Sequence, residues 1–158
     1  MIKKSNQPPP KYPFTQEGYE KIKQEYEDLL NSRPEVLDHL KKAREMGDLS
    51  ENGYYKSYKF KLISLDVRLR KLSYLLKHKE IIQSPDNQTV HLGNTVTISN
   101  DNTQTQYTIV GPFESHPAEN KISNKSPLGQ TLLGKKPGET IQVQTPTQIT
   151  TYKIIKIQ

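Results

Sequence analysis

Two acidic side chains, Asp48 and Glu51, stand three residues apart in a short segment between two helix-like stretches. Carboxylate oxygens at this spacing can converge on one hard cation such as Mg²⁺, which is commonly held by one or two carboxylates. Two side chains cannot fill an octahedral site, so the remaining ligands would come from water or another molecule's active centre. A plainer interpretation makes Asp48 a helix N-cap and Glu51 its capping-box partner. Both interpretations stay open, since a capping carboxylate can still present an oxygen.

Basic residues lie on both sides of this acidic pair in the sequence. They are Lys41, Lys42, Arg44, Lys56, Lys59 and Lys61. A positive collar behind a negative tip would hold a phosphate backbone and bring the carboxylates to a metal–phosphate centre. The competing interpretation is an ordinary solvated helix face.

Residue periodicity predicts two long helices that place the acidic pair at a turn. One series, with steps of three and four, is Tyr19, Ile22, Tyr26, Leu29, Arg33, Val36, Leu40 and Ala43. The other is Tyr55, Tyr58, Leu62, Leu65, Leu69, Leu72 and Leu76. Such spacing is typical of a coiled-coil seam. The two series mirror each other about residue 49, which predicts an antiparallel hairpin about 40 Å long with Asp48 and Glu51 at its far end.

Local signals predict where these helices begin, end and bend. Thr15 is a plausible N-cap for the first helix, and Gly47 is a stop signal at its end. Arg33 is the one polar member of the seam. Pro34 follows it, which predicts a kink or bulge at that point.

The second half of the chain predicts a small, mainly antiparallel sheet with one short helix. Alternating residues indicate strands, and polar turn residues lie near 100–102 and 145–146. Ser126 as N-cap, Pro127 at the first helical position and Gly134 after the end predict a helix of about two turns. The fold class is therefore α+β: a flexible extension over 1–12, a helical hairpin over 13–83 and a sheet domain over 84–158. The expected strands are 95–99, 106–110, 141–143 and 151–157.

Composition narrows the classes of function. Only 32% of the 158 residues are apolar, which fits small domains with thin cores. Cysteine is absent, which excludes thiolate chemistry and fits a reducing cytosol, so the expected location is cytoplasmic. The four histidines lack the spacing of metal ligands, so a histidine-built metal site is not expected. The sequence has no apolar run of the length that a membrane span or a secretory signal needs, so we expect neither. The net charge is +6, and residues 52–79 carry eight basic groups against Asp66 alone, which favours an acidic neighbour or a polyanion.

Two sequence blocks resemble the Gre family of bacterial transcript cleavage factors, and the likeness covers roughly residues 13–158. The first block is Ala43, Arg44, Glu45, Gly47, Asp48, Leu49, Glu51, Asn52 and Tyr55. The second is Ile122, Ser123, Ser126, Pro127, Leu128, Gly129, Leu132, Leu133, Gly134, Lys135, Lys136 and Gly138. Two blocks in the family's order are more specific than either alone. Gly53 and Tyr54 depart from it, since the family often has a small residue and an acid there.

The resemblance implies a coiled-coil hairpin followed by an FKBP-like domain, in a monomer that binds RNA polymerase. The second domain would dock at the rim of the secondary channel, through Ser123, Ser126, Pro127 and Leu128. Asp48 and Glu51 would help hold the second Mg²⁺, shared with the polymerase and not bound stably by the chain alone. The polymerase itself would cleave backtracked RNA, so the chain is expected to be an accessory factor and not an enzyme. The residues expected to face the 3′ end of the nascent RNA are Arg44, Lys59, Lys41 and Lys56.

Other interpretations remain at this stage. A Gre-like regulator could occupy the same channel without supporting cleavage, although both tip carboxylates are retained. A stand-alone RNA-binding arm is disfavoured because an acidic tip repels phosphate. A prolyl isomerase is disfavoured because the second half has few aromatic residues to line a pocket. The residues assigned to docking could instead serve helix capping and core packing.

Overall fold

The computed structural model describes residues 10–47, 51–83, 87–100, 103–144 and 149–158. The chain divides into two compact units, Glu20–His78 and a second that joins Met1–Tyr19 to Lys79–Gln158. Among the described residues, no helix combines the length and the apolar character needed to cross a membrane.

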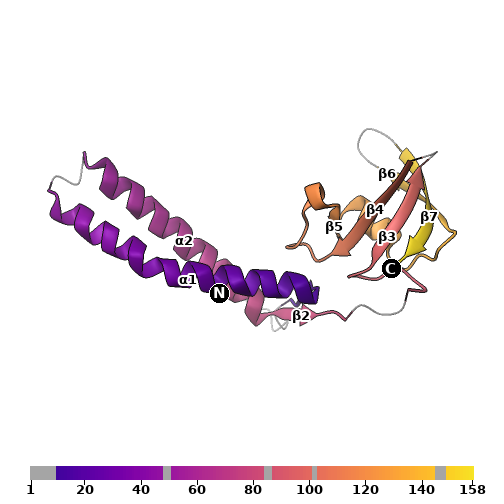
Figure 1. The fold of residues 1–158 in the computed structure, drawn as a ribbon, viewed down its shortest axis with the longest axis horizontal. Helices are drawn as coiled ribbons and strands as arrows, with labels where there is room; N and C mark the ends of the chain where they lie inside the picture. Colours follow the sequence, from indigo (N-terminus) through magenta and orange to yellow (C-terminus); the bar gives the residue numbers. More distant parts are fainter. Residues whose placement is uncertain (1–9, 48–50, 84–86, 101–102, 145–148) are drawn as a thin grey trace, which may run out of the picture. The chain divides into compact units, whose positions relative to one another are not determined.

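The first unit is the predicted helical hairpin (Figure 1). Helix α1 spans Gln16–Glu45 and helix α2 spans Gly53–Lys77. Val36, Leu65 and Leu69 form a buried cluster between the helices, and other seam residues pack against it: Tyr26, Leu29, Tyr58 and Leu62. The mirrored series is therefore confirmed as the seam. Near its base, Leu75 is buried more deeply than the expected Leu76.

Arg33, the polar member of the seam, is satisfied across the hairpin. Its Nε donates to Asp66 Oδ1 at 2.7 Å and its Nη2 donates to Asp66 Oδ2 at 3.2 Å. A two-pronged guanidinium–carboxylate contact is stronger and more directional than a single charged hydrogen bond. Helix α1 continues through Pro34 as one α-helix, and the bend expected there stays a prediction.

The Arg33–Asp66 pair predicts an acid-sensitive hairpin. The hydrogen bonds from Arg33 lower the pKa of the Asp66 carboxyl below its usual range. A lowered folded pKa contributes stability above the unfolded value of about 3.9, and this is lost as pH falls through the folded pKa. We expect the difference in thermal unfolding midpoint between wild type and Asp66→Asn to shrink as the pH is lowered from 6 to 2. Asp28→Asn, at an exposed aspartate outside the seam, is the control; a gap for Asp66→Asn that is constant with pH would contradict the prediction.

The predicted start and end of α1 are confirmed. Thr15 caps α1, because Gly18 N donates to Thr15 Oγ1 at 3.0 Å and Tyr19 N donates to Thr15 O at 3.0 Å. At the other end, Gly47 has a φ of 91°, the left-handed conformation that commonly follows a helix and favours glycine.

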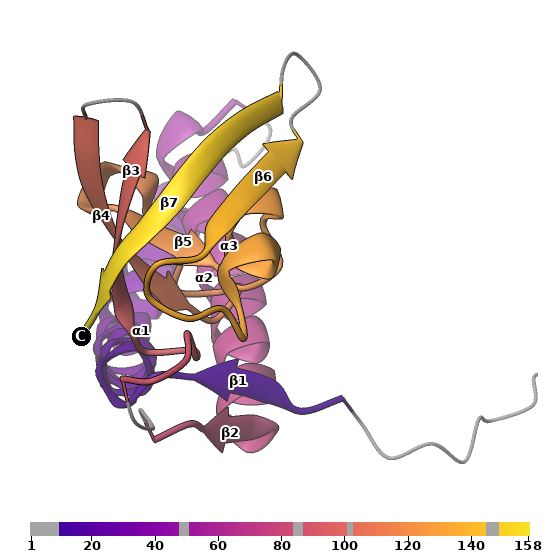
Figure 2. The ribbon, with the colours of Figure 1, turned by 90° about the vertical axis from the view of Figure 1, so that its right-hand side faces the viewer.

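The second unit contains a five-stranded sheet in the order β5-β4-β3-β7-β6 (Figure 2). Its strands are β3 (Thr95–Asn100), β4 (Thr103–Val110), β5 (Lys121–Ser123), β6 (Thr140–Gln144) and β7 (Ile149–Ile157). All neighbours are antiparallel except β4 and β5, which are parallel. The four predicted strands are confirmed with slightly different ends, whereas β5 was not expected. The two predicted turns fall largely outside the described residues.

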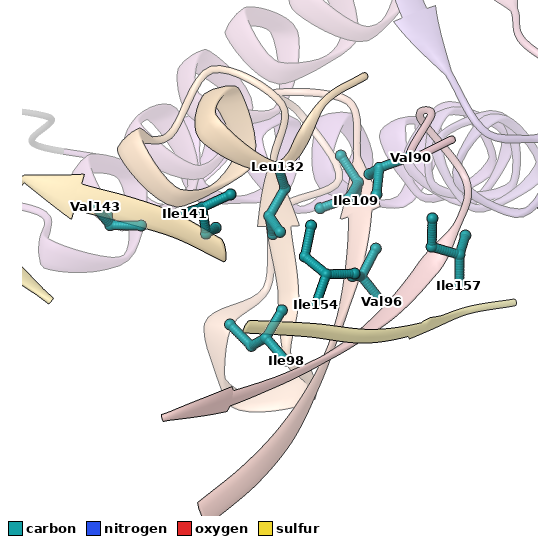
Figure 3. Packing of buried hydrophobic residues seen from close by; sticks show 9 residues of the cluster. All are labelled: Val90, Val96, Ile98, Ile109, Leu132, Ile141, Val143, Ile154 and Ile157. Atoms are coloured by element: carbon teal, nitrogen blue, oxygen red, sulfur yellow. The ribbon is translucent and has the colours of Figure 1, made fainter. Parts of the chain in front are cut away.

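The core of this unit lies between the sheet and helix α3 (Pro127–Leu132), as Figure 3 shows. Its buried residues are Val90, Val96, Ile98, Ile109, Leu132, Ile141, Val143, Ile154 and Ile157. The predicted caps of α3 are confirmed: Ser126 is the N-cap, and Gly134, after the helix end, has a φ of 76°.

A two-stranded parallel sheet in the second unit was not predicted. Strand β1 (Tyr12–Phe14) pairs with β2 (Lys79–Ile81), which directly follows the end of α2. Phe14 is buried and its ring stacks on Phe113 with centroids 6.4 Å apart. The Glu114 carboxylate accepts hydrogen bonds from the Thr15 backbone, the Thr15 hydroxyl and the Gly111 backbone. These contacts attach the residue before α1 to the loop after β4. The same loop continues into a 3₁₀ turn, η1, at Pro117–Glu119.

Candidate functional site at the hairpin tip

The acidic pair belongs to the connection between α1 and α2. Glu51 is exposed and lies in a turn just before α2. No other described residue forms a hydrogen bond or ion pair with its carboxylate. Asp48, the other predicted metal ligand, falls outside the described residues. Within the part of the chain that the structure describes, no group of three or more His, Cys, Asp or Glu side chains could hold a metal ion.

The N-cap of α2 is Asn52, so the capping-box interpretation of Asp48 and Glu51 is wrong. Asn52 has extended backbone angles, φ −74° and ψ 96°, and its Oδ1 accepts from Tyr55 N at 3.0 Å. A capping box would start a helix directly after Asp48, whereas α2 starts at Gly53. Glu51 therefore precedes the cap and is not needed to satisfy the first turn of the helix.

Asn52 also connects the two helices. Its Nδ2 donates to the backbone carbonyl of Ala43 at 2.9 Å. Ala43 is fully buried near the end of α1, where the last carbonyls lack partners within the helix. One side-chain amide thus joins the end of α1 to the start of α2, next to Glu51.

Arg44 and Lys59, two residues predicted to face RNA, approach the same aromatic ring. Arg44 Cζ lies 5.8 Å and Lys59 Nζ 5.9 Å from the centroid of Tyr55. Cations at this distance are attracted by the ring. Lys41 and Lys56, the other two predicted residues, are also exposed. The structure therefore places basic side chains from both helices close to the tip.

The two remaining lysines of the predicted collar have contacts of their own. Lys42 Nζ pairs with Asp38 at 2.7 Å, and this partner raises the pKa of Lys42. Lys61 Nζ lies 5.6 Å from the ring of Tyr58. Lys42 therefore stays charged, but the negative charge of Asp38 offsets part of its contribution to the positive surface.

An aromatic cluster beside the tip was missed by the sequence analysis. His39 Nδ1 and Tyr54 Oη are 2.5 Å apart, and the His39 ring stacks on Tyr58 with centroids 4.7 Å apart. Tyr54 and Tyr58 are one turn apart on α2, with centroids 4.8 Å apart. Burial, followed by the neighbouring Tyr58, raises the pKa of Tyr54. In the sequence, the i, i+4 spacing of the two tyrosines was the pattern that could have indicated this cluster. Tyr54 thus braces the first turn of α2 against α1.

Gly53, the first residue of α2, predicts a stabilising substitution. A Cβ at this position would meet no atom within 4 Å, and its φ is not positive. Gly53→Ala should therefore stabilise the hairpin by about 0.4–1 kcal/mol, mainly by reducing the freedom of the unfolded chain. The matched control is Gly47→Ala, which should destabilise because the φ of 91° strains any side chain. Thermal unfolding measures both, and a lower midpoint for Gly53→Ala would contradict the prediction.

The residues assigned to docking lie around the start of α3. Ser126 Oγ accepts from Gly129 N at 3.1 Å and donates to Ser123 O at 2.7 Å. Leu128 packs against the core of the sheet domain, whereas Pro127 is exposed. Capping and packing therefore account for Ser126 and Leu128, and a docking role for the four residues stays a prediction.

The chain is similar to known proteins over nearly its whole length. A family described as "Transcription elongation factor, N-terminal" (GreA/GreB) matches residues 12–81, and "Transcription elongation factor, GreA/GreB, C-term" matches residues 85–158. Transcription elongation factor GreA of Thermomicrobium roseum is 41% identical over 150 residues, covering 92% of this chain and 96% of that protein.

A second relative, transcription elongation factor GreA of Bacillus cereus, is 40% identical over 152 residues, covering 93% of this chain and 96% of that protein. Among solved structures, GreA factor homolog 1 of Thermus thermophilus aligns with 94% of this chain and 99% of its own, at 22% identity and a TM-score of 0.46. The two family matches together span nearly the whole chain. The chain therefore belongs to the GreA/GreB family of transcription elongation factors.

Proposed function

We propose that this chain stimulates the RNA polymerase's own endonucleolytic cleavage of backtracked nascent RNA and so rescues arrested complexes. The observation that carries this proposal is the position of Glu51, exposed between the ends of two long helices and not used for helix capping. A carboxylate in this position can be presented to a reaction centre in another molecule. The hairpin would enter the secondary channel, while the polymerase supplies the catalytic site.

The donor set suits Mg²⁺, which prefers oxygen ligands and usually keeps several of its waters. Glu51 and Asp48 are the residues that would hold it, together with ligands from the polymerase. When bound, a second Mg²⁺ supplies an activated water and neutralises charge that develops on the phosphate. The tip would thus serve as a removable part of a two-metal site.

The basic residues would hold the RNA during this reaction. Arg44 and Lys59 come from different helices and approach one ring, so together they present two positive charges on one part of the tip. Lys41 and Lys56 would extend this surface along α1 and α2. Their contacts to phosphate are independent of sequence and weaken with salt. The 3′ segment of the backtracked RNA is the expected ligand.

The second unit would dock at the rim of the channel through the start of α3. Exposed Pro127 and the neighbouring Ser123, Ser126 and Leu128 form one continuous corner of the domain. Because Ser126 is locked by two hydrogen bonds, this corner is held in shape before any partner binds. Such preorganisation lowers the entropy lost on binding.

A direct test uses a stalled elongation complex with 5′-labelled, backtracked RNA. We expect the full-length chain to bind core polymerase and shorten the labelled RNA in a Mg²⁺-dependent reaction, faster than polymerase alone. If the chain binds polymerase but leaves the rate of RNA cleavage unchanged, it is instead a Gre-like regulator of the same channel. If it does not bind, both functions are excluded.

A further inference from the structure

The amide of Asn52 satisfies an unpaired group at each of two helix ends. Ala43 O is among the last four carbonyls of α1, and Tyr55 N is among the first four amides of α2. A carboxamide can accept and donate at the same time, which a carboxylate or an aliphatic side chain cannot. Asn52 is partly buried, and its own carbonyl accepts from Lys56 N at 3.1 Å. This residue therefore fixes where α2 starts relative to the end of α1.

The consequence falls on Glu51, the residue directly before Asn52. Gly53 follows Asn52, and a glycine at the first helical position adds no stiffness. On the α2 side of the tip, the chain is therefore restrained by the Asn52 bridge and by the His39–Tyr54 contact two residues further on. Movement of Asn52 would move the backbone that carries the Glu51 carboxylate.

We propose that Asn52 is a positioning residue, which holds Glu51 in place by bridging Ala43 O and Tyr55 N. This inference rests on the proposed function for its effect on cleavage, but its structural part can be tested alone. Asn52 touches neither metal nor RNA in this proposal. It acts through the backbone, and its loss raises the Mg²⁺ concentration needed for stimulation.

Two substitutions separate the bridge from the helix cap. Asn52→Asp and Asn52→Ser both keep an oxygen that can cap α2, so both should preserve the helix start. Neither can donate to Ala43 O in the way that the amide does: aspartate has no N–H, and serine is shorter. Asp adds a charge that could itself attract Mg²⁺, whereas Ser does not. Asn31→Asp, at an exposed position in α1, is the matched control for charge.

The first measurement is the Mg²⁺ dependence of RNA cleavage in the stalled elongation complex. We expect the half-saturating Mg²⁺ concentration to rise about tenfold in Asn52→Ser, as for loss of other groups that orient metal ligands. Affinity for core polymerase and the maximal rate at saturating Mg²⁺ should change little. A purely structural role would instead lower the thermal midpoint or the polymerase affinity and leave the Mg²⁺ requirement of bound protein unaltered, which would overturn the proposal.

The second measurement needs no polymerase. Because the chain has no cysteine, Glu27→Cys and Glu51→Cys can carry two spin labels without background. The distance between labels at an exposed site on α1 and at the tip reports the spread of positions at residue 51. We expect the distribution to broaden in both Asn52 variants and to stay unchanged in Asn31→Asp. An unchanged width in the Asn52 variants overturns the proposal. If wild type does not stimulate cleavage but the width increases, the proposed function fails and the bridge stands.

Discussion

Glu51→Gln is expected to reduce stimulated RNA cleavage by at least about tenfold, equal to about 1.4 kcal/mol of transition-state stabilisation. Gln keeps the size and one oxygen of the side chain but removes the charge that binds Mg²⁺. The structure supports a clean comparison, because Glu51 is exposed and lies outside α2. Folding and polymerase binding should therefore be unaffected. Initial cleavage rates in a stalled elongation complex, over a range of protein and Mg²⁺ concentrations, provide the measurement.

The companion substitution Asp48→Asn should act in the same direction, and the double variant should approach the rate of polymerase alone. Higher Mg²⁺ should partly restore the single variants, since losing one ligand weakens the site without abolishing it. Glu27→Gln makes the same chemical change at an exposed position on α1 and should have no effect. If the variants stimulate cleavage as strongly as wild type at limiting Mg²⁺, the tip does not have the metal-holding role.

The largest effect on stability is expected for Ile154→Ala in β7. Ile154 is fully buried in the cluster between the sheet and α3. Removing a buried isoleucine side chain typically costs about 2–5 kcal/mol, because it loses transfer free energy and leaves a cavity. The core of this unit is small, so such a loss is a large fraction of typical domain stability, about 5–15 kcal/mol. Chemical denaturation followed by circular dichroism measures the change.

The neighbouring residue provides a matched control. Ile155 is of the same type in the same strand, but it is 41% exposed and lies where the pairing of β7 with β3 shifts register. Ile155→Ala should cost less than about 1 kcal/mol, the range of strand propensity in host proteins. Similar losses at the two positions would mean that the burial of Ile154 does not control the stability of this unit.

The local and periodic features of this chain follow from the sequence alone. The mirrored apolar series identifies both helices and the seam between them, because a helical repeat places every third or fourth residue on one face. The helix ends at Thr15, Gly47 and Ser126 were also predictable, since caps depend on interactions within a few residues. Alternating residues located β3, β4, β6 and β7 for the same reason.

Other features required the tertiary structure. Strands β1, β2 and β5 have three residues each, too few to show a period, and β1 pairs with a strand more than sixty residues away. The sequence suggested Asp48 and Glu51 as a capping box, but the capping residue is Asn52, because only the approach of the two helix ends lets one amide reach both Ala43 and Tyr55. The sequence thus determined which residues carry the charge at the tip. The helix packing decided that Glu51 is left exposed beside a bridged pair of helix ends, because side-chain partners across a turn depend on geometry and not on spacing.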